Sequence, residues 1–228
     1  ANTAGVRVNG LALVSQFGSD QFTVTPTGDH SAQIVDAGLN TAINVNNVLS
    51  LLIDGNDGVV PTNQLTVVTP NSASTVAVDL DSVDITGLLS VQYVDIQSVV
   101  EQGGVGRDTF NVNPTGAPAI SIIGGAPIGG TPGDALNITA PAAVTLNVGP
   151  AADAGSVTVG TDVVSYSQIE SLGVTLTAAG AAGAVVINGT NADDDITVIA
   201  TGTNDFTVSV NAGPAVVFTD ATSLTVNA

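Results

Sequence analysis

The stretch that decides the fold is Gly106-Arg107-Asp108-Thr109-Phe110-Asn111-Val112-Asn113-Pro114-Thr115-Gly116, because the chain repeats it. Nearly the same sequence occurs at Gly18–Gly28, and a more divergent copy occupies Asp194–Gly202. In each copy an aspartate, and in the first two a glycine, supply turn chemistry, and apolar residues alternate with polar ones as in a half-buried strand. Three copies at a near-constant spacing predict a repeat protein built from β-strands.

The rest of the chain supports an all-β fold. The core of the motif is an acid or Asn, any residue, a large apolar residue, Thr or Asn, and then Val or Ile. It recurs at Asn63–Val67, Asp134–Ile138 and Asn204–Val208. No long segment has an apolar period of 3.6 residues with helix caps. The apolar run Val48–Ile53 is of the kind expected for a strand buried on both faces.

Two β architectures fit this pattern. Short strands, Gly and Asn corners and small side chains favour a β-solenoid of the parallel β-helix type. The gaps between motif copies are not multiples of one coil, however. The distance from Asp20 to Asp108 is also close to the size of an immunoglobulin-like sandwich, about 100 residues, so tandem sandwiches are the alternative. We divide the chain into repeats at 1–90, 91–163 and 164–228, or treat it as one continuous elongated domain.

Segments that begin with an aromatic residue mark the repeats. Tyr93–Val99 and Tyr166–Leu172 each stand upstream of an Asp motif, and Phe218–Leu224 resembles both. After this third segment the sequence stops. It therefore ends where another repeat is expected to begin.

Composition excludes several classes of function. There are 20 acidic residues against two basic ones, Arg7 and Arg107, which gives a net charge of −18. Nucleic acids and anionic membranes need basic patches, so neither is an expected partner. No apolar run approaches the roughly 20 residues that span a bilayer, so no membrane insertion is expected. The Ala at the start suggests a removed signal peptide, which places the protein outside the cell or on its surface.

Enzymatic activity is not expected. The chain has no cysteine and a single histidine, His30, in a turn-like stretch, so neither a thiol nucleophile nor a Ser-His-Asp triad is available. A polysaccharide lyase on a β-helix is the sharpest enzymatic alternative. The lack of Trp and Lys to hold a sugar argues against it.

Calcium is the candidate cofactor, because it binds carboxylate and carbonyl oxygens gathered by Gly/Asn/Asp loops. The densest oxygen clusters are Asp54, Asn56 and Asp57, and Asn191, Asp193, Asp194 and Asp195. The competing interpretation is that these side chains satisfy turn backbone. On that interpretation the motif residues Asp20, Asp108 and Asp194 turn the chain and bind no ion.

The pattern Gly-x-Asp-x-Phe-x-Val, with Tyr-x-x-Ile-x-Ser-Leu/Val upstream, resembles repeats of very large bacterial surface and extracellular proteins. Ile187–Val198 is most similar to them. This resemblance implies an exported, β-rich protein with a structural or adhesive role. A weaker resemblance is to the calcium-binding nonapeptides of RTX proteins, which Gly18–Phe22, Gly106–Phe110 and Gly129–Leu136 match in part. It implies calcium between consecutive repeats, whereas here the motifs stand apart.

These observations predict a structural subunit of an extracellular filament or surface layer that assembles head to tail with copies of itself. An uncapped β-stack leaves strand edges that need covering. The apolar residues expected at the joints are Val6, Val8, Leu11 and Leu13 near one terminus and Leu224 and Val226 near the other. The alternative is a calcium-stiffened adhesin, or a stalk segment of a giant surface protein. Its loop Gly124–Gly133 or its acidic face would contact cell-surface glycans or matrix.

Overall fold

The computed structural model describes residues 10–15, 19–37, 41–55, 62–130, 132–149, 151–178, 180–211 and 213–227. In these ranges the chain forms two sheets of 11 strands and a short 3-10 helix, η1 (Gly180–Gly183). The prediction of an all-β fold is therefore confirmed. None of the helical structure described is long and apolar enough to cross a membrane.

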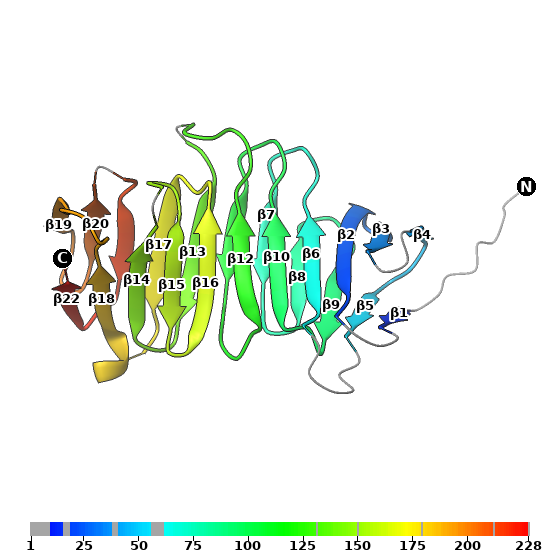
Figure 1. Ribbon diagram of the computed structural model, residues 1–228, viewed down its shortest axis with the longest axis horizontal. Coiled ribbons are helices and arrows are strands. Elements are labelled where there is room, and N and C mark those ends of the chain that lie inside the picture. Colours follow the sequence, from blue (N-terminus) through cyan, green and yellow to red (C-terminus); the bar gives the residue numbers. More distant parts are fainter. Residues whose placement is uncertain are drawn as a thin grey trace, which may run out of the picture.

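Both sheets run along the longest axis of the molecule, with their strands across it (Figure 1). Sheet 1 contains, in spatial order, β1 (Leu11–Val14), β5 (Leu51–Asp54), β9 (Val91–Val94), β8 (Ser82–Ile85), β7 (Thr75–Val78), β11 (Thr109–Val112), β13 (Ala135–Ala140), β17 (Ser171–Leu176), β21 (Val216–Thr219), β20 (Phe206–Val210) and β19 (Ile196–Ala200). Sheet 2 contains β22 (Ser223–Asn227), β18 (Ala184–Asn188), β14 (Val144–Val148), β15 (Gly155–Val159), β16 (Asp162–Ser167), β12 (Ala119–Ile123), β10 (Ser98–Gln102), β6 (Gln64–Val68), β2 (Gln21–Gly28), β3 (Ser31–Asp36) and β4 (Thr41–Asn46).

The chain alternates between the two sheets, and successive turns pair in parallel, as in β2–β6–β10–β12. Three-stranded antiparallel meanders interrupt this winding. They are β2–β4 and β14–β16 in sheet 2, and β7–β9 and β19–β21 in sheet 1. The first and third strands of a meander share one direction, so the parallel winding resumes unchanged after each. Both sheets continue across the expected repeat limits at 90/91 and 163/164, and the second limit falls inside β16.

The core lies between the sheets. Along most strands every second residue is buried, because side chains of a strand alternate between its two faces. The inward residues are mainly Val, Ile and Leu, with Phe22, Phe110 and Phe218 as the largest. The run Val48–Ile53 was expected to be buried on both faces, and this is wrong. Leu49 is 47% exposed, and the strand in this run, β5, buries only alternate residues.

The copies of the motif lie in different sheets. Phe22 belongs to β2 in sheet 2, whereas Phe110 belongs to β11 in sheet 1 and Ile196 to the edge strand β19. Each meander also adds two strands to a turn. The unequal gaps between motif copies follow from these two facts.

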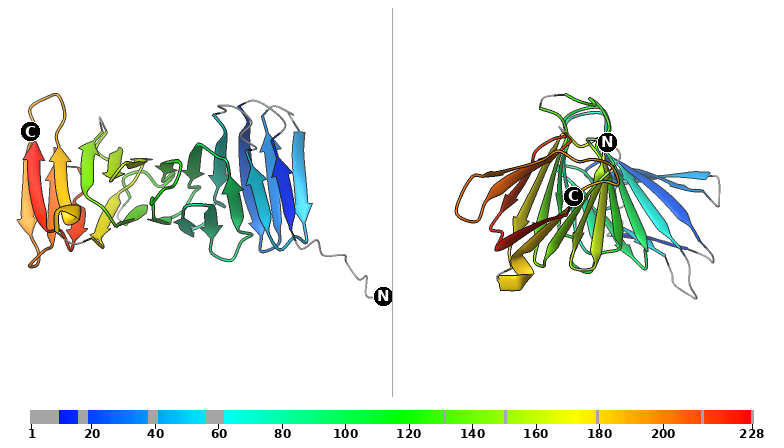
Figure 2. Two further views of the ribbon diagram at one scale, coloured as in Figure 1. Left: turned by 90° about the horizontal axis from the view of Figure 1, so that it is seen from below. Right: turned by 60° about the vertical axis from the view of Figure 1, so that its left-hand side comes forward.

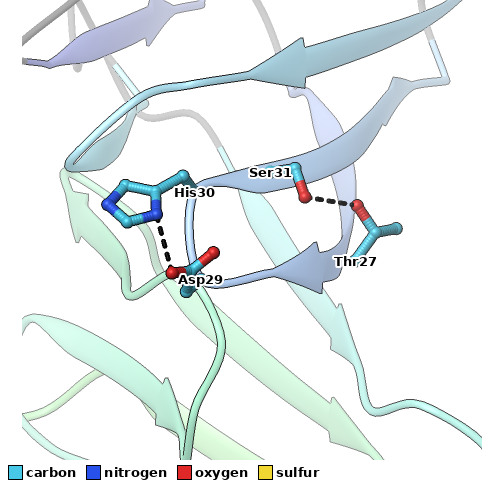
Figure 3. A network of polar contacts seen from close by, with 4 residues as sticks. All are labelled: Thr27, Asp29, His30 and Ser31. Carbon is cyan, nitrogen blue, oxygen red and sulfur yellow. Dashed lines mark hydrogen bonds and ion pairs between the residues drawn. The ribbon is translucent and has the colours of Figure 1, made fainter. Parts of the chain in front are cut away.

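His30 lies in the turn between β2 and β3, where the sequence placed it (Figure 3). Its Nδ1 lies 2.9 Å from Asp29 Oδ2, and across the hairpin the Thr27 hydroxyl donates to Ser31 Oγ at 3.0 Å. These contacts close the turn.

Candidate functional site

The two ends of the double sheet are the candidate site. One end presents β1 of sheet 1 and β4 of sheet 2 as edge strands, and the other presents β19 and β22. The two ends lie at opposite extremes of the long axis (Figures 1 and 2). A strand at a sheet edge leaves one row of N–H and C=O groups without a partner strand.

The residues predicted for assembly lie at these ends, as far as they are described. Leu11 and Leu13 are half-buried on β1 and pack against the core. At the opposite end Leu224 is half-buried on β22, and Val226 on the same strand is 40% exposed. Val6 and Val8 lie outside the described residues. Among the described residues, Leu11 and Leu13 thus lie at one end and Leu224 and Val226 at the other.

Strand direction is the same at both ends of each sheet. In sheet 1, β1 and β19 point the same way, because an unbroken series of parallel pairs and whole meanders connects them. The same holds for β22 and β4 in sheet 2. A translated copy would therefore meet both edges in parallel, which is the pairing that successive turns use inside the chain.

The interior is open at the β19/β22 end. A pocket of about 300 Å³ lies there between the two sheets, and its apolar walls include Val198, Phe206 and Leu224. Val198 on the edge strand is 42% exposed, although it belongs to the inward row of β19 opposite the buried Val208. Apolar surface that points into the core thus reaches solvent at this end.

Polar side chains form two ladders at opposite corners of the winding. At one corner, Asp20 N–H donates to Asn63 Oδ1 at 2.9 Å, and Asn63 N–H donates to Gln97 Oε1 at 2.7 Å. These three residues directly precede β2, β6 and β10. Each side chain therefore satisfies a backbone donor of the neighbouring turn, as expected if the motif acids support turns.

The second ladder is acidic and precedes strands of sheet 1. Ser74 N–H donates to Asp108 Oδ1 at 2.8 Å, Asp108 N–H to Asp134 Oδ1 at 2.7 Å, and Asp134 N–H to Glu170 Oε2 at 2.7 Å. Glu170 Oε1 accepts a second donor, Gly129 N–H, at 2.8 Å. This second contact also ties the loop Gly124–Gly133 to the ladder.

Two acids of this ladder and one beside it are buried with oxygens that accept no hydrogen bond from the described residues: Asp108 and Asp134 each with Oδ2, and the neighbouring Glu101 with both Oε atoms. Glu101 lies on the inward row of β10, between Val67 of β6 and Ile122 of β12. Burial raises the pKa of the Glu101 carboxyl well above its usual range, and the charge of Asp108 adds to this effect. Burial likewise raises the pKa of Asp108 and of Asp134. The backbone N–H groups of Ser74 and Gly104 offset part of the effect at Asp108, and the N–H of Asp108 does so at Asp134.

Two of the acidic residues predicted for calcium, Asp194 and Asp195, take part in hydrogen bonds. Asp194 Oδ2 accepts Thr190 N–H at 2.7 Å, and its Oδ1 accepts the Thr190 hydroxyl at 2.9 Å and Asn211 Nδ2 at 2.7 Å. The hydrogen bond from Asn211 is the largest of the effects that lower the pKa of Asp194. Asp195 N–H donates to Asn211 Oδ1 at 2.9 Å. These contacts close the turn before β19.

The other predicted ligands are not gathered around a common point. Asn191 and Asp193 are exposed in the same turn, Asp54 ends β5, and Asn56 and Asp57 lie outside the described residues. In the part of the chain that the structure describes, no group of three or more Asp, Glu or His side chains is placed to hold a metal ion.

Sequence reasoning missed Glu101 and the ladders. In Ser98-Val99-Val100-Glu101-Gln102 a period of two puts Glu101 on the same face as Val99, so the signal for a buried acid was present. The ladders pair residues on different turns, and no local pattern marks such pairs.

No family model, curated protein or solved structure matches this chain.

Proposed function

We propose that the protein is the structural subunit of an extracellular filament or surface layer, and that it assembles head to tail by continuing both sheets from one copy into the next. The observation that carries this proposal is the agreement in strand direction between β1 and β19 and between β4 and β22. At each end, a neighbouring copy would then meet two edge strands that both run in the direction needed for parallel pairing.

The apolar rows support the same joint. At one end Leu11 and Leu13 point toward the core, and at the other Val198 and Leu224 do so beside an open pocket. Stacking the ends would bury these side chains, at about 25 cal/mol per Å² of apolar surface. An interface that repeats head to tail without closing on itself gives a fibre.

Charge opposes this assembly and makes it sensitive to salt. Copies with a net charge of −18 repel one another. Salt shortens the reach of this repulsion to about 8 Å at physiological ionic strength. Assembly is therefore expected to be favoured by salt in general, with calcium as one way of supplying it.

Negative-stain microscopy of the purified protein, in sodium chloride with calcium and with a chelator, tests the proposal. Uniform fibres in both conditions are the expected result. Separate particles in both would overturn self-assembly and leave the segment of a longer surface protein, or the adhesin, as the function. Fibres only with calcium would contradict a metal-independent joint.

Proline at the free edges tests the joint itself. Leu11 N–H donates to the carbonyl of Ser50, directly before β5, and Ser15 N–H to that of Asp54 at its end, so the N–H of Ala12 points away from β5. On β22 the carbonyl of Asn227 accepts Gly189 N–H, so the N–H of Val226 points to the free edge. Ala12→Pro and Val226→Pro each remove a donor from the joint and none from the fold.

Each proline is expected to raise the protein concentration needed for fibres by about tenfold, since a hydrogen bond contributes about 1.4 kcal/mol or less. Ala12→Ser and Val226→Thr, which keep the N–H, are the matched controls and should assemble like the parent. Far-UV circular dichroism checks that all four variants fold. Normal fibres from both proline variants would exclude these edges as the joint.

A further inference from the structure

The acidic ladder differs from its counterpart at the opposite corner in one chemical respect. In the ladder at that opposite corner, Asn63 occupies the place that Asp108 and Asp134 occupy in the acidic ladder. The amide of Asn63 has a donor as well as an acceptor. Its Oδ1 accepts Asp20 N–H, while its Nδ2 donates to the carbonyl of Gly55 at 2.8 Å. Both halves of the buried amide are therefore satisfied.

Asp108 lies beside Gly103, and Asp134 beside Gly124, in the way that Asn63 lies beside Gly55. A Cβ added to Gly55 would lie 2.7 Å from Asn63 Nδ2 and 1.9 Å from a carbonyl oxygen of the next turn. A Cβ on Gly103 would lie 3.1 Å from Asp108 Oδ2, and one on Gly124 would lie 2.8 Å from Asp134 Oδ2. In both cases a carbonyl oxygen of the next turn again lies within 2 Å of that position, at 1.8 Å and 1.9 Å. Relative to its glycine, each Oδ2 therefore lies about where Asn63 Nδ2 lies relative to Gly55.

An ionised carboxylate does not fit this place. It has acceptors only, whereas the corresponding atom of Asn63 is a donor directed at a carbonyl oxygen. A buried carboxyl oxygen without a protein partner is satisfied by a bound water, a bound ion or a bound proton, and only the proton reproduces the donor of Asn63. In the described ranges no three acids are grouped around a metal position, and Arg107, the basic residue next to Asp108, is exposed.

We propose that Asp108 and Asp134 are neutral carboxylic acids in the folded protein, each with Oδ2–H acting as the donor that the amide supplies in Asn63. Glu101, fully buried among aliphatic side chains, is the third neutral acid of this group. The folded chain therefore carries protons that the unfolded chain releases at neutral pH. Protonation of these three acids therefore favours the folded chain, so its free energy of unfolding should be higher at acidic than at neutral pH.

The charged groups around the cluster agree with this assignment. Asp108 faces Glu101 and Asp134, and Asp134 faces Asp108 and Glu170, so the titratable groups that these two acids face are themselves acidic. Glu170 differs from these acids, because each of its two oxygens accepts an N–H donor. Ionising Asp108 or Asp134 would place a second negative charge beside another acid in a buried corner.

The sign of the pH effect follows from the raised pKa values. A carboxyl group whose pKa is higher in the folded than in the unfolded chain contributes its full stabilisation below the unfolded value, about 4. That contribution is lost as the pH rises through the folded value. Stability should therefore fall as the pH rises above about 4, which is opposite to the behaviour of a salt-bridged carboxylate.

Substitution by amides tests the proposal on the intact chain. Asp108→Asn and Asp134→Asn supply the donor permanently, so each variant should be at least as stable as the parent at neutral pH. Glu170→Gln is the matched control on the next rung of the ladder. It should be destabilised at neutral pH, because its new amide nitrogen would face an N–H donor. Urea unfolding between about pH 4 and about pH 8 measures all four proteins.

Two readouts separate protonation from a merely structural effect. The slope of unfolding free energy against pH should change by about one proton for each Asp→Asn substitution. The infrared carbonyl band of protonated carboxyl groups should be present in the parent at neutral pH and weaker in each variant. Calcium should stabilise the parent no more than it stabilises the variants.

Three results would overturn the proposal. The first is that Asp108→Asn and Asp134→Asn lose as much stability as Glu170→Gln. The second is that the infrared band of protonated carboxyl groups is absent from the parent. The third is that calcium stabilises the parent and that both substitutions abolish this stabilisation. The last result would make the carboxylates metal ligands. None of these measurements depends on filament formation, so the proposal stands or fails separately from the proposed function.

Discussion

Three glycines at the corners allow successive turns to lie directly against one another. A Cβ on Gly55, Gly103 or Gly124 would come within 2 Å of the carbonyl oxygen of Asp95, Gly124 or Gln168 respectively. Each glycine also donates its N–H to the strand of the next turn, as Gly103 does to Ile123 O at 2.8 Å. These positions need glycine because there is no space for a side chain.

Gly103→Ala is therefore expected to destabilise the protein by at least about 2 kcal/mol, since a backbone atom blocks the new methyl group. Gly173→Ala is the matched control. Gly173 lies in β17, and the nearest atom to its added Cβ is a side-chain oxygen, Asn137 Oδ1, at 3.3 Å. This control should change stability by less than about 1 kcal/mol. Equal urea midpoints for the two variants would mean that the corner relaxes freely.

Elements were predictable from the sequence where a local pattern determines them. Thr109–Val112 alternates with period two after an Asp turn, so its existence, its type and its buried Phe110 could all be predicted. The role of Asp194 in a turn could also be predicted, because one of its donors, Thr190, is only four residues away.

The meanders and the partner of each strand were not predictable in this way. β7, β8 and β9 show the same alternation as the parallel strands, and nothing local shows that β8 runs opposite to its neighbours. Pairing is decided by contacts between distant residues, such as Thr75 with Thr109. The candidate site consists of the edge strands β1, β4, β19 and β22. The terminal strands β1 and β22 could be predicted to take part, but the edge positions of β4 and β19 could not.

The meander β19–β21 supports one of the proposed joints. Its packing centres on Phe218, which is fully buried and stacks on Phe206 with ring centroids 5.1 Å apart. Phe218→Ala should cost about 3–5 kcal/mol, and Phe206→Ala distinctly less, because Phe206 is only half-buried.

Hydrogen exchange shows whether this loss is local to the element. In Phe218→Ala, the amides of β19 and β20 should lose more protection than those of β2 and β6 at the other end of the chain. Uniform loss of protection would mean that the molecule unfolds as one cooperative unit. In that case the meander is not an independently stable part of the end.

The whole molecule is a stack with two equal sheets, and this fixes the dimension of any fibre built from it. Each sheet has 11 strands, which at a spacing of about 4.8 Å gives an axial length of roughly 50 Å for one copy. Because the sheets have equal numbers of strands, both are continued by one translation. The strands would lie across the fibre axis, as they lie across the long axis of the chain (Figure 1).

Head-to-tail assembly therefore predicts a fibre with an axial repeat of roughly 50 Å and a strong meridional reflection at about 4.8 Å. A two-fold arrangement, in which like ends meet, would reverse the strand direction at each joint and double the repeat to roughly 100 Å, because two copies would form the unit. Cryo-electron microscopy or fibre diffraction of aligned filaments distinguishes the two values. A doubled repeat would exclude the parallel joint between β19 and β1 even if fibres form, since like ends can pair only in antiparallel.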